Sequence, residues 1–555
     1  MQIMKLRYII SAFVIALMSS ACSDFLNTSL DRNQTGETIA TDRSTIWYFG
    51  NAFYSPIGYG FTMIDDNIFA TASDEAQQTS ASSDVIYFNK GMINESVNPL
   101  FYCYQNYYEG IRAANFFLEY VADGKGEELL AQNRNLVTDA TNYKKDLESL
   151  AWFKAEAHIA RAYYYAELIK MYGGVPIIES SQDNGQMVRR SSYEEVVEYI
   201  VKEIDENKGA LAVNWNDYTD REGRFTLGAA LAIKARVLLY AASPLHNASN
   251  DVSKWERAAA AVNELVSNTS LSYSLAADYG SYFTGGNPLT SSETIYAVRS
   301  WGSNTMEVRN YPISTQGGNS GATPTHNLVS AYEYIGTPDP TDPYANRDPR
   351  LEASIVTNGS TWNGRVIDQS AGGSDDMANA NASKTGYYLK KFLTDNLNLV
   401  QGATTQHNWV AYRWGEVLLN YAEAMNEAYG PDAVPTGFSM SARQALQMVR
   451  DRASASLPEV KAADVASFRE AVKHERRIEL AFEDHRYWDL LRWKDAMDVL
   501  NSPVLGVKVS KTGDNWNYQV AEVAARTFHE RNYYLPFLRS EIENSNNTLE
   551  QNPQY

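Results

Sequence analysis

Residues 147–174, LESLAWFKAEAHIARAYYYAELIKMYGG, decide the fold class of this chain. Apolar residues recur in this stretch at spacings of three and four, which is the periodicity of an α-helix with a buried face. The stretch ends on Gly173 and Gly174, and glycine is common where a helix stops. Val175 and Pro176 follow, and a proline cannot continue a helix. The sequence therefore predicts one long helix that stops at Gly173.

Two more helices are predicted directly after the long one. Ser192 and Glu195 have the spacing of a capping box, in which two side chains satisfy backbone N–H groups at a helix start. Thr226 is placed to cap the next helix, over 227–242, which is apolar on almost every side and should lie between neighbouring helices. The two caps are 34 residues apart, the repeat length of tetratricopeptide helix pairs.

Helical sequence fills two blocks, at about 100–268 and about 408–500. In the first block, Ser253 with Glu256 predicts the start of a fourth helix. In the second block, three segments have helical periodicity: 410–429, 441–453 and 468–500.

The stretches at about 51–98 and 270–405 differ, because they are irregular and the second is rich in Gly, Ser, Asn, Thr and Pro. GTPDPTDPYANRDPR at 336–350 is typical of turns. Loops on a rigid scaffold commonly carry binding residues. No clean linker interrupts the pattern. We therefore predict one mostly α domain over 43–555, a tetratricopeptide-like scaffold of helix pairs with long, irregular, loop-rich elaborations that form the binding part.

The composition of the 555-residue chain excludes several classes of protein. Its 48 Lys and Arg against 67 Asp and Glu give a net charge of -19, which repels polyphosphates, so no nucleic acid partner is expected. Two cysteines and seven histidines lack the spacings of zinc sites. The glycine-rich loops of nucleotide-binding proteins and the G-x-S-x-G motif of serine hydrolases do not occur in the sequence.

The first 22 residues indicate export. Lys5 and Arg7 precede an apolar run of eleven residues, 8–18, which is too short to span a bilayer core of about 30 Å. Small residues then lead into Cys22, a pattern that resembles a bacterial lipobox. We predict a lipoprotein signal peptide over 1–21, lipidation of Cys22 and a polar tether over 22–42. Ordinary signal-peptidase cleavage near Ala21 is the alternative.

A series of motifs resembles the SusD/RagB family of outer-membrane lipoproteins of Bacteroidetes-type bacteria. The motifs are ARAYYY at 160–165, YGGVP at 172–176, YRWGEVLL with YAEA at 412–424, VRDRA at 449–453, ERRIELAFE with RYWDL and RW at 475–493, and LP, EI and QNP between 535 and 555. Asp484 stands where the family usually has glycine. Aspartate is among the few residues that tolerate a positive φ, so a helix-ending turn is still expected there.

The resemblance implies a tetratricopeptide-like helical scaffold and a lipid anchor that holds the protein at the cell surface on the outer membrane. It implies capture of oligosaccharides for a TonB-dependent barrel transporter of the SusC type, without catalysis. Some relatives capture peptides, so a peptide-binding member that feeds a peptide transporter is the alternative. A glycoside hydrolase is a third hypothesis.

Charged residues between 474 and 493 alternate in sign at helical spacings, which predicts a salt-bridged seam between packed helices. The members of this set are Glu475, Arg476, Arg477, Glu479, Glu483, Arg486, Asp489 and Arg492. The neighbours His474–Glu475 and Asp484–His485 also allow an acid–base interpretation, which is the sequence basis of the hydrolase hypothesis.

The candidate ligand site follows from the aromatic residues of the loops. A sugar stacks its C–H face on an aromatic ring while amides, carboxylates and guanidinium groups bind its hydroxyls. SWGSN at 300–304 supplies both kinds of group, and Trp301 is the predicted stacking platform. The resemblance implies a site built from the N-terminal irregular region and the middle loops. By position this indicates Asp66, Asp74, Asn89, Arg299, Trp301, Asn304 and Tyr311.

No cofactor is predicted, although the acidic loops leave calcium open. Carboxylate and backbone oxygens are the ligands that Ca²⁺ prefers. The acidic residues in question are Asp339, Asp342, Asp348, Asp375 and Asp376. Their spacing does not match an EF-hand, and turn formation by Asp-Pro sequences is the other explanation for the first three.

Overall fold

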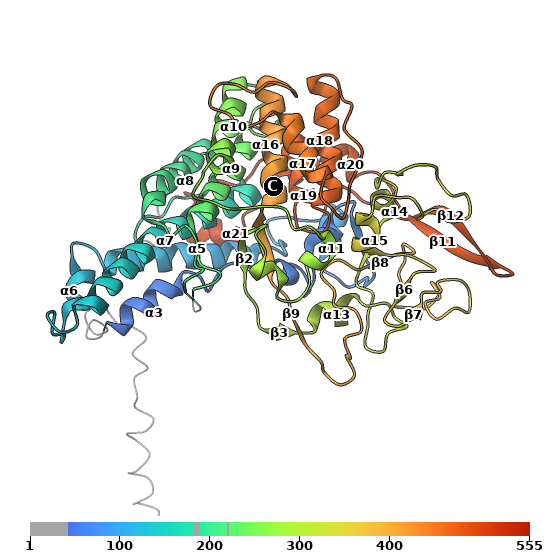
Figure 1. Ribbon diagram of the computed structural model, residues 1–555, viewed down its shortest axis with the longest axis horizontal. Helices are drawn as coiled ribbons and strands as arrows, with labels where there is room; N and C mark the ends of the chain where they lie inside the picture. The colour runs from blue at the N-terminus through green and yellow to red at the C-terminus, as the bar shows by residue number, and fades with distance from the viewer. Residues whose placement is uncertain (1–42, 183–187, 219–220) are drawn as a thin grey trace, which may run out of the picture.

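The computed structural model describes residues 43–182, 188–218 and 221–555. Cys22, the predicted signal peptide and the predicted tether lie outside the described residues. None of the helices within these ranges combines the length and hydrophobicity needed to cross a bilayer. Helices dominate one half of the molecule and irregular chain the other (Figure 1). The prediction of a mostly α fold is confirmed.

The long predicted helix is α7, Ala140–Tyr172, which begins seven residues before the predicted start. It ends at Gly173, whose φ of 72° is easily adopted only by glycine and whose N–H donates to the Ile169 carbonyl. Helix α7 packs between α5, Phe101–Tyr120, and α8, Tyr193–Asn207. Its last two turns are almost wholly buried. This helix is the central element of the helical half.

The helices after α7 form the predicted pairs. Helix α8 has the Ser192–Glu195 capping box, and Thr226 caps α9, Leu227–Ala242. Helix α9 packs on α8 and on α10, Val252–Val266. The predicted cap of α10 is wrong by two residues, because the Asp251 carboxylate accepts the bond from the Ser253 N–H. Consecutive helices thus pack as neighbours, and the tetratricopeptide-like arrangement is confirmed.

The second helical block is more divided than predicted. The segment predicted to be helical from 410 begins as strand β10, Trp409–Arg413, which pairs antiparallel with β2, Thr294–Val298. Helix α16, Trp414–Tyr429, then packs on α17, Ala442–Arg450, and on α18, Val465–Glu479. A pairing partner 111 to 119 residues away in the chain decided the conformation of 409–413, and helical periodicity does not contain that information.

The predicted helix over 468–500 is three helices: α18, α19, Arg486–Trp493, and α20, Ala496–Val499. The break lies at 480–485. Phe482 and Asp484 there have positive φ values of 67° and 61°. The helix-ending turn expected at Asp484 is therefore confirmed.

The loop-rich half consists of short helices and two-stranded pairs. The strand pairs are β1, Ala76–Gln78, with β4, Ala322–Pro324; β3, Gly302–Ser303, with β9, Thr405–Gln406; β5, Ile355–Val356, with β8, Tyr388–Leu389; and β6, Thr361–Trp362, with β7, Arg365–Val366. The hairpin of β11, Val504–Thr512, and β12, Asn515–Ala524, extends from the right-hand end of the molecule (Figure 1). The short helices of the two halves that are not named above are α3, Ser44–Ala52; α4, Val85–Asn89; α6, Lys125–Ala131; α11, Tyr279–Tyr282; α12, Asn287–Thr290; α13, Thr305–Asn310; α14, His326–Val329; α15, Arg350–Ser354; and α21, Arg539–Asn544.

Each half has its own hydrophobic core. The larger core lies among the helices, and the smaller one lies among the loops. Ile478, Ala481 and Phe482, from the end of α18 and the turn after it, belong to the core of the loops. The break after α18 thus inserts helical-block residues into the loop-rich half and fixes it to the scaffold.

A buried ion-pair network, which we call the seam, joins the same two halves. Glu479 is fully buried and binds Arg413 at 2.8 Å, Arg452 at 2.6 Å and Arg350 at 2.9 Å. Glu475 extends the network by binding Arg350 at 2.5 Å. The predicted structural seam is confirmed, and its arginines come from the loops as well as from the helices.

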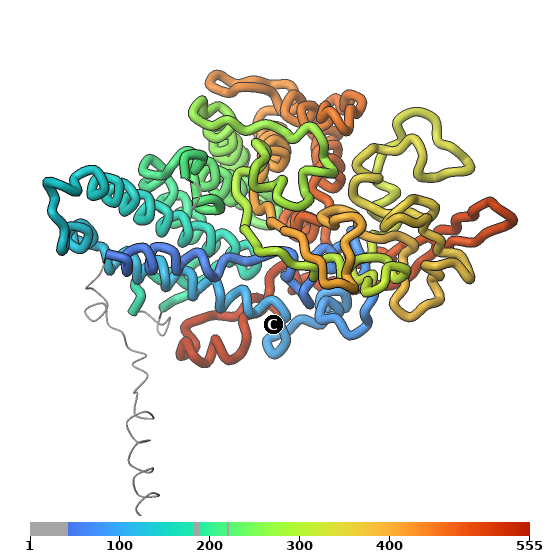
Figure 2. The backbone as a smooth tube through the Cα atoms, turned by 60° about the horizontal axis from the view of Figure 1, so that its bottom comes forward, coloured from blue at the N-terminus to red at the C-terminus, as the bar shows by residue number. Residues whose placement is uncertain are grey.

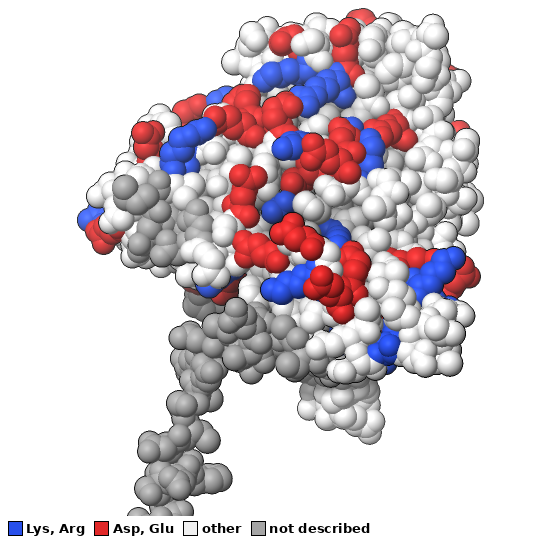
Figure 3. Space-filling view, turned by 90° about the vertical axis from the view of Figure 1, so that its left-hand side faces the viewer, with Lys and Arg blue, Asp and Glu red and all other residues white. Residues whose placement is uncertain are grey.

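The N-terminal chain reaches the loop-rich half by crossing the molecule. In Figure 2 the blue N-terminal segment runs from the helical half on the left into the irregular half on the right. There Asp74 is bound by Arg477 at 2.5 Å and Arg486 at 2.8 Å, both from the seam motif. On the helical face, acidic and basic side chains lie side by side (Figure 3). Among the helices, Lys208 pairs with both Asp205 and Glu264.

Candidate functional site

Trp301 is the most exposed large hydrophobic residue in the described part of the chain, with 94% of its surface accessible. Four other aromatic residues of the middle loops are buried: Phe283, Tyr296, Tyr311 and Trp362. Single exposed aromatic residues are common on protein surfaces, and this exposure leaves the Trp301 indole accessible to a ligand. Trp301 is exposed as predicted, and its role as a stacking platform stays a prediction.

The loop that carries Trp301 is held by its backbone, which leaves the indole free. Strand β3, which begins at the next residue, pairs with β9. The Gln406 amide donates to the Ser300 carbonyl at 3.1 Å, and the Asn304 amide donates to the Ala403 carbonyl at 3.1 Å. A ring on such a loop loses little conformational freedom when a ligand stacks on it.

Polar groups surround this loop. Arg299, two residues before Trp301, forms an ion pair with Glu222 at 2.9 Å, and both side chains are nearly half exposed. Asp66 has a φ of 54° and binds Arg309 of α13 at 2.7 Å. Exposed charged groups of this kind can exchange their weak mutual pairing for hydrogen bonds to a ligand. This pair joins the first loop region to α13, which begins four residues after Trp301.

The surface placement predicted for Asp74, Asn89 and Tyr311 is wrong. Asp74 is 8% exposed, and its pKa is lowered because Arg486 and Arg477 outweigh the effect of burial. The Asn89 amide donates to the Thr71 carbonyl at 3.2 Å, and the Tyr311 hydroxyl donates to the Thr394 carbonyl. Their loops are irregular but densely packed, so irregular sequence was a poor guide to exposure.

The residues of the acid–base interpretation do not border a space large enough for a substrate. Glu475 is buried and paired, and His474 binds Glu333 at 3.2 Å. Burial raises the pKa of Asp484 to about 6 and lowers that of its neighbour His485. The cavity that these two residues line has a volume of only about 40 Å³, enough for a few waters and too small for a sugar ring.

The acidic loops use their carboxylates locally. Asp339 accepts from the Thr341 N–H, Asp376 from the Gly372 N–H, and Asp348 is buried against Arg350. Within 43–182, 188–218 and 221–555, no group of three or more Asp, Glu, His or Cys side chains has the arrangement needed to hold a metal ion. Asp339 and Asp376 thus accept hydrogen bonds within their own loops, and Asp348 serves a buried ion pair.

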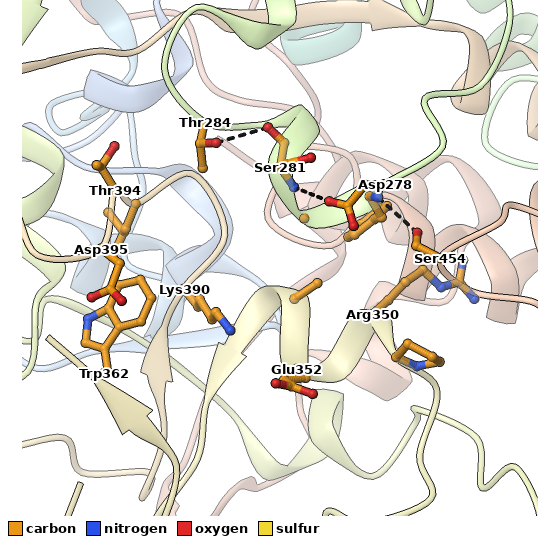
Figure 4. Close-up of a pocket in the computed structure, with 15 residues that line it drawn as sticks. Asp278, Ser281, Thr284, Arg350, Glu352, Trp362, Lys390, Thr394, Asp395 and Ser454 are labelled. Atoms are coloured by element: carbon orange, nitrogen blue, oxygen red, sulfur yellow. Dashed lines mark hydrogen bonds between the residues drawn. The ribbon is translucent and has the colours of Figure 1, made fainter. Parts of the chain in front are cut away.

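A recess of about 480 Å³ lies between α11, α15 and the segment after β8 (Figure 4). Its wall includes Glu352, Lys390 and Asp395, none of which the sequence analysis identified, as well as the buried Trp362. The available signal was weak, because a Lys and a Glu in separate segments resemble any solvated pair.

Known proteins resemble this chain over most of its length. Residues 291–555 match the profile described as SusD family, and residues 24–239 match a profile described as starch-binding associating with outer membrane. SusD-like protein P38 of Formosa agariphila is 21% identical over 380 residues, which cover 64% of this chain and 69% of the relative. SusD-like protein P2 of the same organism is 24% identical, covering 72% of this chain and 74% of the relative.

Solved structures share the fold. A SusD-like protein from Bacteroides fragilis superposes with a TM-score of 0.75 at 26% identity and covers 94% of this chain and 98% of its own. A SusD-like carbohydrate-binding protein from the same species gives 0.73 at 22% identity, covering 92% and 100%. A laminarin-binding SusD-like protein gives 0.66 at 21% identity, covering 93% and 100%.

Proposed function

The chain belongs to the SusD family, and from that premise we propose that it is a glycan-binding protein that captures oligosaccharides through the Trp301 surface and does not cleave them. The description of the second matching profile names starch, and the names of two structural neighbours refer to carbohydrate and laminarin. These names support a saccharide as the ligand class.

The observation that carries the proposal is the exposure of Trp301 on a backbone-fixed loop. The indole offers a stacking face, and Arg299 and Asn304 offer a guanidinium and an amide two and three residues away in the chain. Asp66 adds an exposed carboxylate in its pair with Arg309 of α13. An open surface of this kind suits internal segments of a chain-like ligand, because nothing closes around its ends. The groups just named include no two carboxylates that face each other. A glycosidase needs such a pair, so this set of groups favours binding over hydrolysis.

Calorimetric titration with laminarin and with soluble starch tests this proposal. Trp301→Ala should weaken binding of the recognised glycan about tenfold, because truncating an aromatic anchor commonly costs more than about 1 kcal/mol. Tyr48→Ala is the matched control, since Tyr48 is 72% exposed on α3, outside the site. An unchanged affinity in Trp301→Ala would exclude the platform. Binding of oligopeptides in place of glycans would favour the peptide alternative.

The purified protein should release no reducing sugar from the glycan that it binds. A reducing-sugar assay on the recognised glycan, run overnight with purified protein, checks this directly. Steady release that survives repurification would replace the binding proposal with the hydrolase hypothesis.

We further propose that Cys22 carries the lipid anchor and that the protein hands its ligand to a TonB-dependent barrel in the outer membrane. The lipobox-like residues before Cys22 and the outer-membrane association in the profile description support this placement. Labelling with a fatty-acid analogue should mark the wild type and not Cys22→Ala. A pull-down from native membranes in mild detergent should recover a barrel partner; recovery of none would count against transport coupling.

A further inference from the structure

We propose that the recess between α11, α15 and the segment after β8 is a second saccharide site, which takes an uncharged sugar ring of the same glycan. This inference rests on the proposed function and deepens it, because it names a ligand class for a place other than the Trp301 surface.

The size and lining of the recess suit a sugar. Its volume of about 480 Å³ lies within the range of small-molecule sites, about 300–1,000 Å³. Both apolar residues and residues with hydroxyl groups line it. The apolar lining comes from Pro349, Ala353, Trp362 and Leu393, and the hydroxyl lining from Ser281, Thr284, Thr394 and Ser454.

Two charged side chains in the recess have no counter-ion. Lys390 and Glu352 form no ion pair with any described residue, whereas Arg350 in the same wall is paired with Asp348 at 2.7 Å. Figure 4 shows Lys390 reaching toward the middle of the ring of lining residues, with Glu352 at its lower margin. The Lys390 ammonium lies 5.9 Å from the centre of the Trp362 ring. Unpaired charges beside a cavity are ready to bind a ligand's polar groups.

The charges favour an uncharged polyol over an ion. An anion would face Glu352, Asp278 and Asp395 together, and a cation placed in the middle would meet the ammonium of Lys390. A sugar hydroxyl avoids both conflicts, because it donates to a carboxylate and accepts from an ammonium at the same time.

The recess and the Trp301 loop are joined by one short strand pair. The Thr394 hydroxyl in the recess wall bonds the Thr405 hydroxyl at 3.3 Å, and Thr405 pairs with Ser303, two residues after Trp301. A single glycan chain that engages both places would bind more tightly than either place alone allows, because the second contact becomes intramolecular.

The experiment uses four proteins: wild type, Trp301→Ala, a recess variant that combines Glu352→Gln and Lys390→Met, and both sets together. Lys508→Met with Glu522→Gln is the matched control, since both residues are exposed on the β11–β12 hairpin. Each protein is titrated with laminarihexaose and maltohexaose, and melting curves verify folding. We expect the recess variant to lose about fivefold or more in affinity for the bound hexasaccharide, the control to lose none, and the combined variant to lose more than either.

The outcomes separate this inference from the proposed function. If Trp301→Ala weakens binding and the recess variant does not, the recess inference is wrong and the Trp301 surface stands. If only the recess variant weakens binding, the recess stands and the platform is wrong.

A second arm tests the ligand class at the recess. Methyl β-glucoside, glucuronate and glucosamine are compared by saturation-transfer NMR in the Trp301→Ala background. We expect the neutral glucoside to give the strongest signal, and Lys390→Met with Glu352→Gln to abolish it. A stronger signal from either charged sugar would overturn the assignment to an uncharged ring.

Discussion

The seam around Glu479 and the surface around Trp301 contain the same types of charged residue, acids and arginines, in opposite environments. In the seam, Glu479 and its three arginine partners are at most 1% exposed at their side chains. At the Trp301 surface, Asp66 and Arg309 form a single pair with side chains 61% and 44% exposed. Burial makes the first network obligatory for the fold, and solvent leaves the second pair free to rearrange around a ligand.

Breaking the seam should have the largest effect on stability. Glu479→Ala leaves Arg413, Arg452 and Arg350 each without one carboxylate in a dry interior, and removing one partner of a buried pair costs about 3–5 kcal/mol. Chemical denaturation should show this loss, or soluble expression should fail. A variant with wild-type stability would show that the seam is not what joins the two halves.

The pH dependence of a second buried cluster, Asp489 with Arg476 and Arg492, should be the next largest effect on stability. Burial alone would raise the pKa of Asp489, but Arg476 and Arg492 outweigh it and lower the pKa to about 2. Because the folded-state pKa lies below the unfolded value of about 3.9, the stabilisation is complete above about pH 5 and is lost progressively as the pH falls toward 2.

This contribution amounts to about 2–3 kcal/mol. The stability difference between the wild type and Asp489→Asn should therefore shrink between pH 5 and pH 3, as denaturant titrations at each pH can measure. A difference that stays constant over this range would contradict the assigned pKa.

The exposed pair should matter far less. Arg309→Ala removes the partner of Asp66 at the surface, and exposed ion pairs contribute about 0–1 kcal/mol. Its midpoint in denaturant should stay close to that of the wild type at 0.15 M salt. A loss as large as that of Glu479→Ala would mean that the two regions do not differ as described.

Trp301→Ala should have the smallest effect on stability, because an indole that is 94% exposed contributes little to packing. We expect a change in unfolding free energy within about 0.5 kcal/mol, together with the loss of glycan affinity described above. A thermal melt run beside the calorimetry measures both. A melt lowered by several degrees would show that the indole packs against the protein in solution.

Local sequence signals located most of the helical half. The capping box of α8, the Thr226 cap, the glycine after α7 and the apolar helix α9 are set by residues close in the chain, so their sequence carried the information. The strand at 409–413 was missed because its partner is distant in the chain. The same limit explains Asp74, whose burial depends on two arginines from the seam motif.

The site was only partly predictable for a related reason. Trp301 lies in a polar stretch with no periodic apolar neighbours, and this pattern is itself a signal of exposure. Tyr311 lies in a similar stretch, yet its ring fills the core of the loops. Whether an aromatic ring in an irregular segment faces inward depends on contacts with distant segments, which no local pattern records.

The contacts of Asp74 also constrain the order of events during folding. Its partners Arg477 and Arg486 lie 403 and 412 residues further along the chain. During synthesis the segment around Asp74 emerges early, while the two arginines that neutralise it emerge near the end. Contacts between residues this far apart in the chain form slowly, because a long loop must close before they can be made. A chain released before residue 477 would therefore leave the Asp74 carboxylate without either arginine partner.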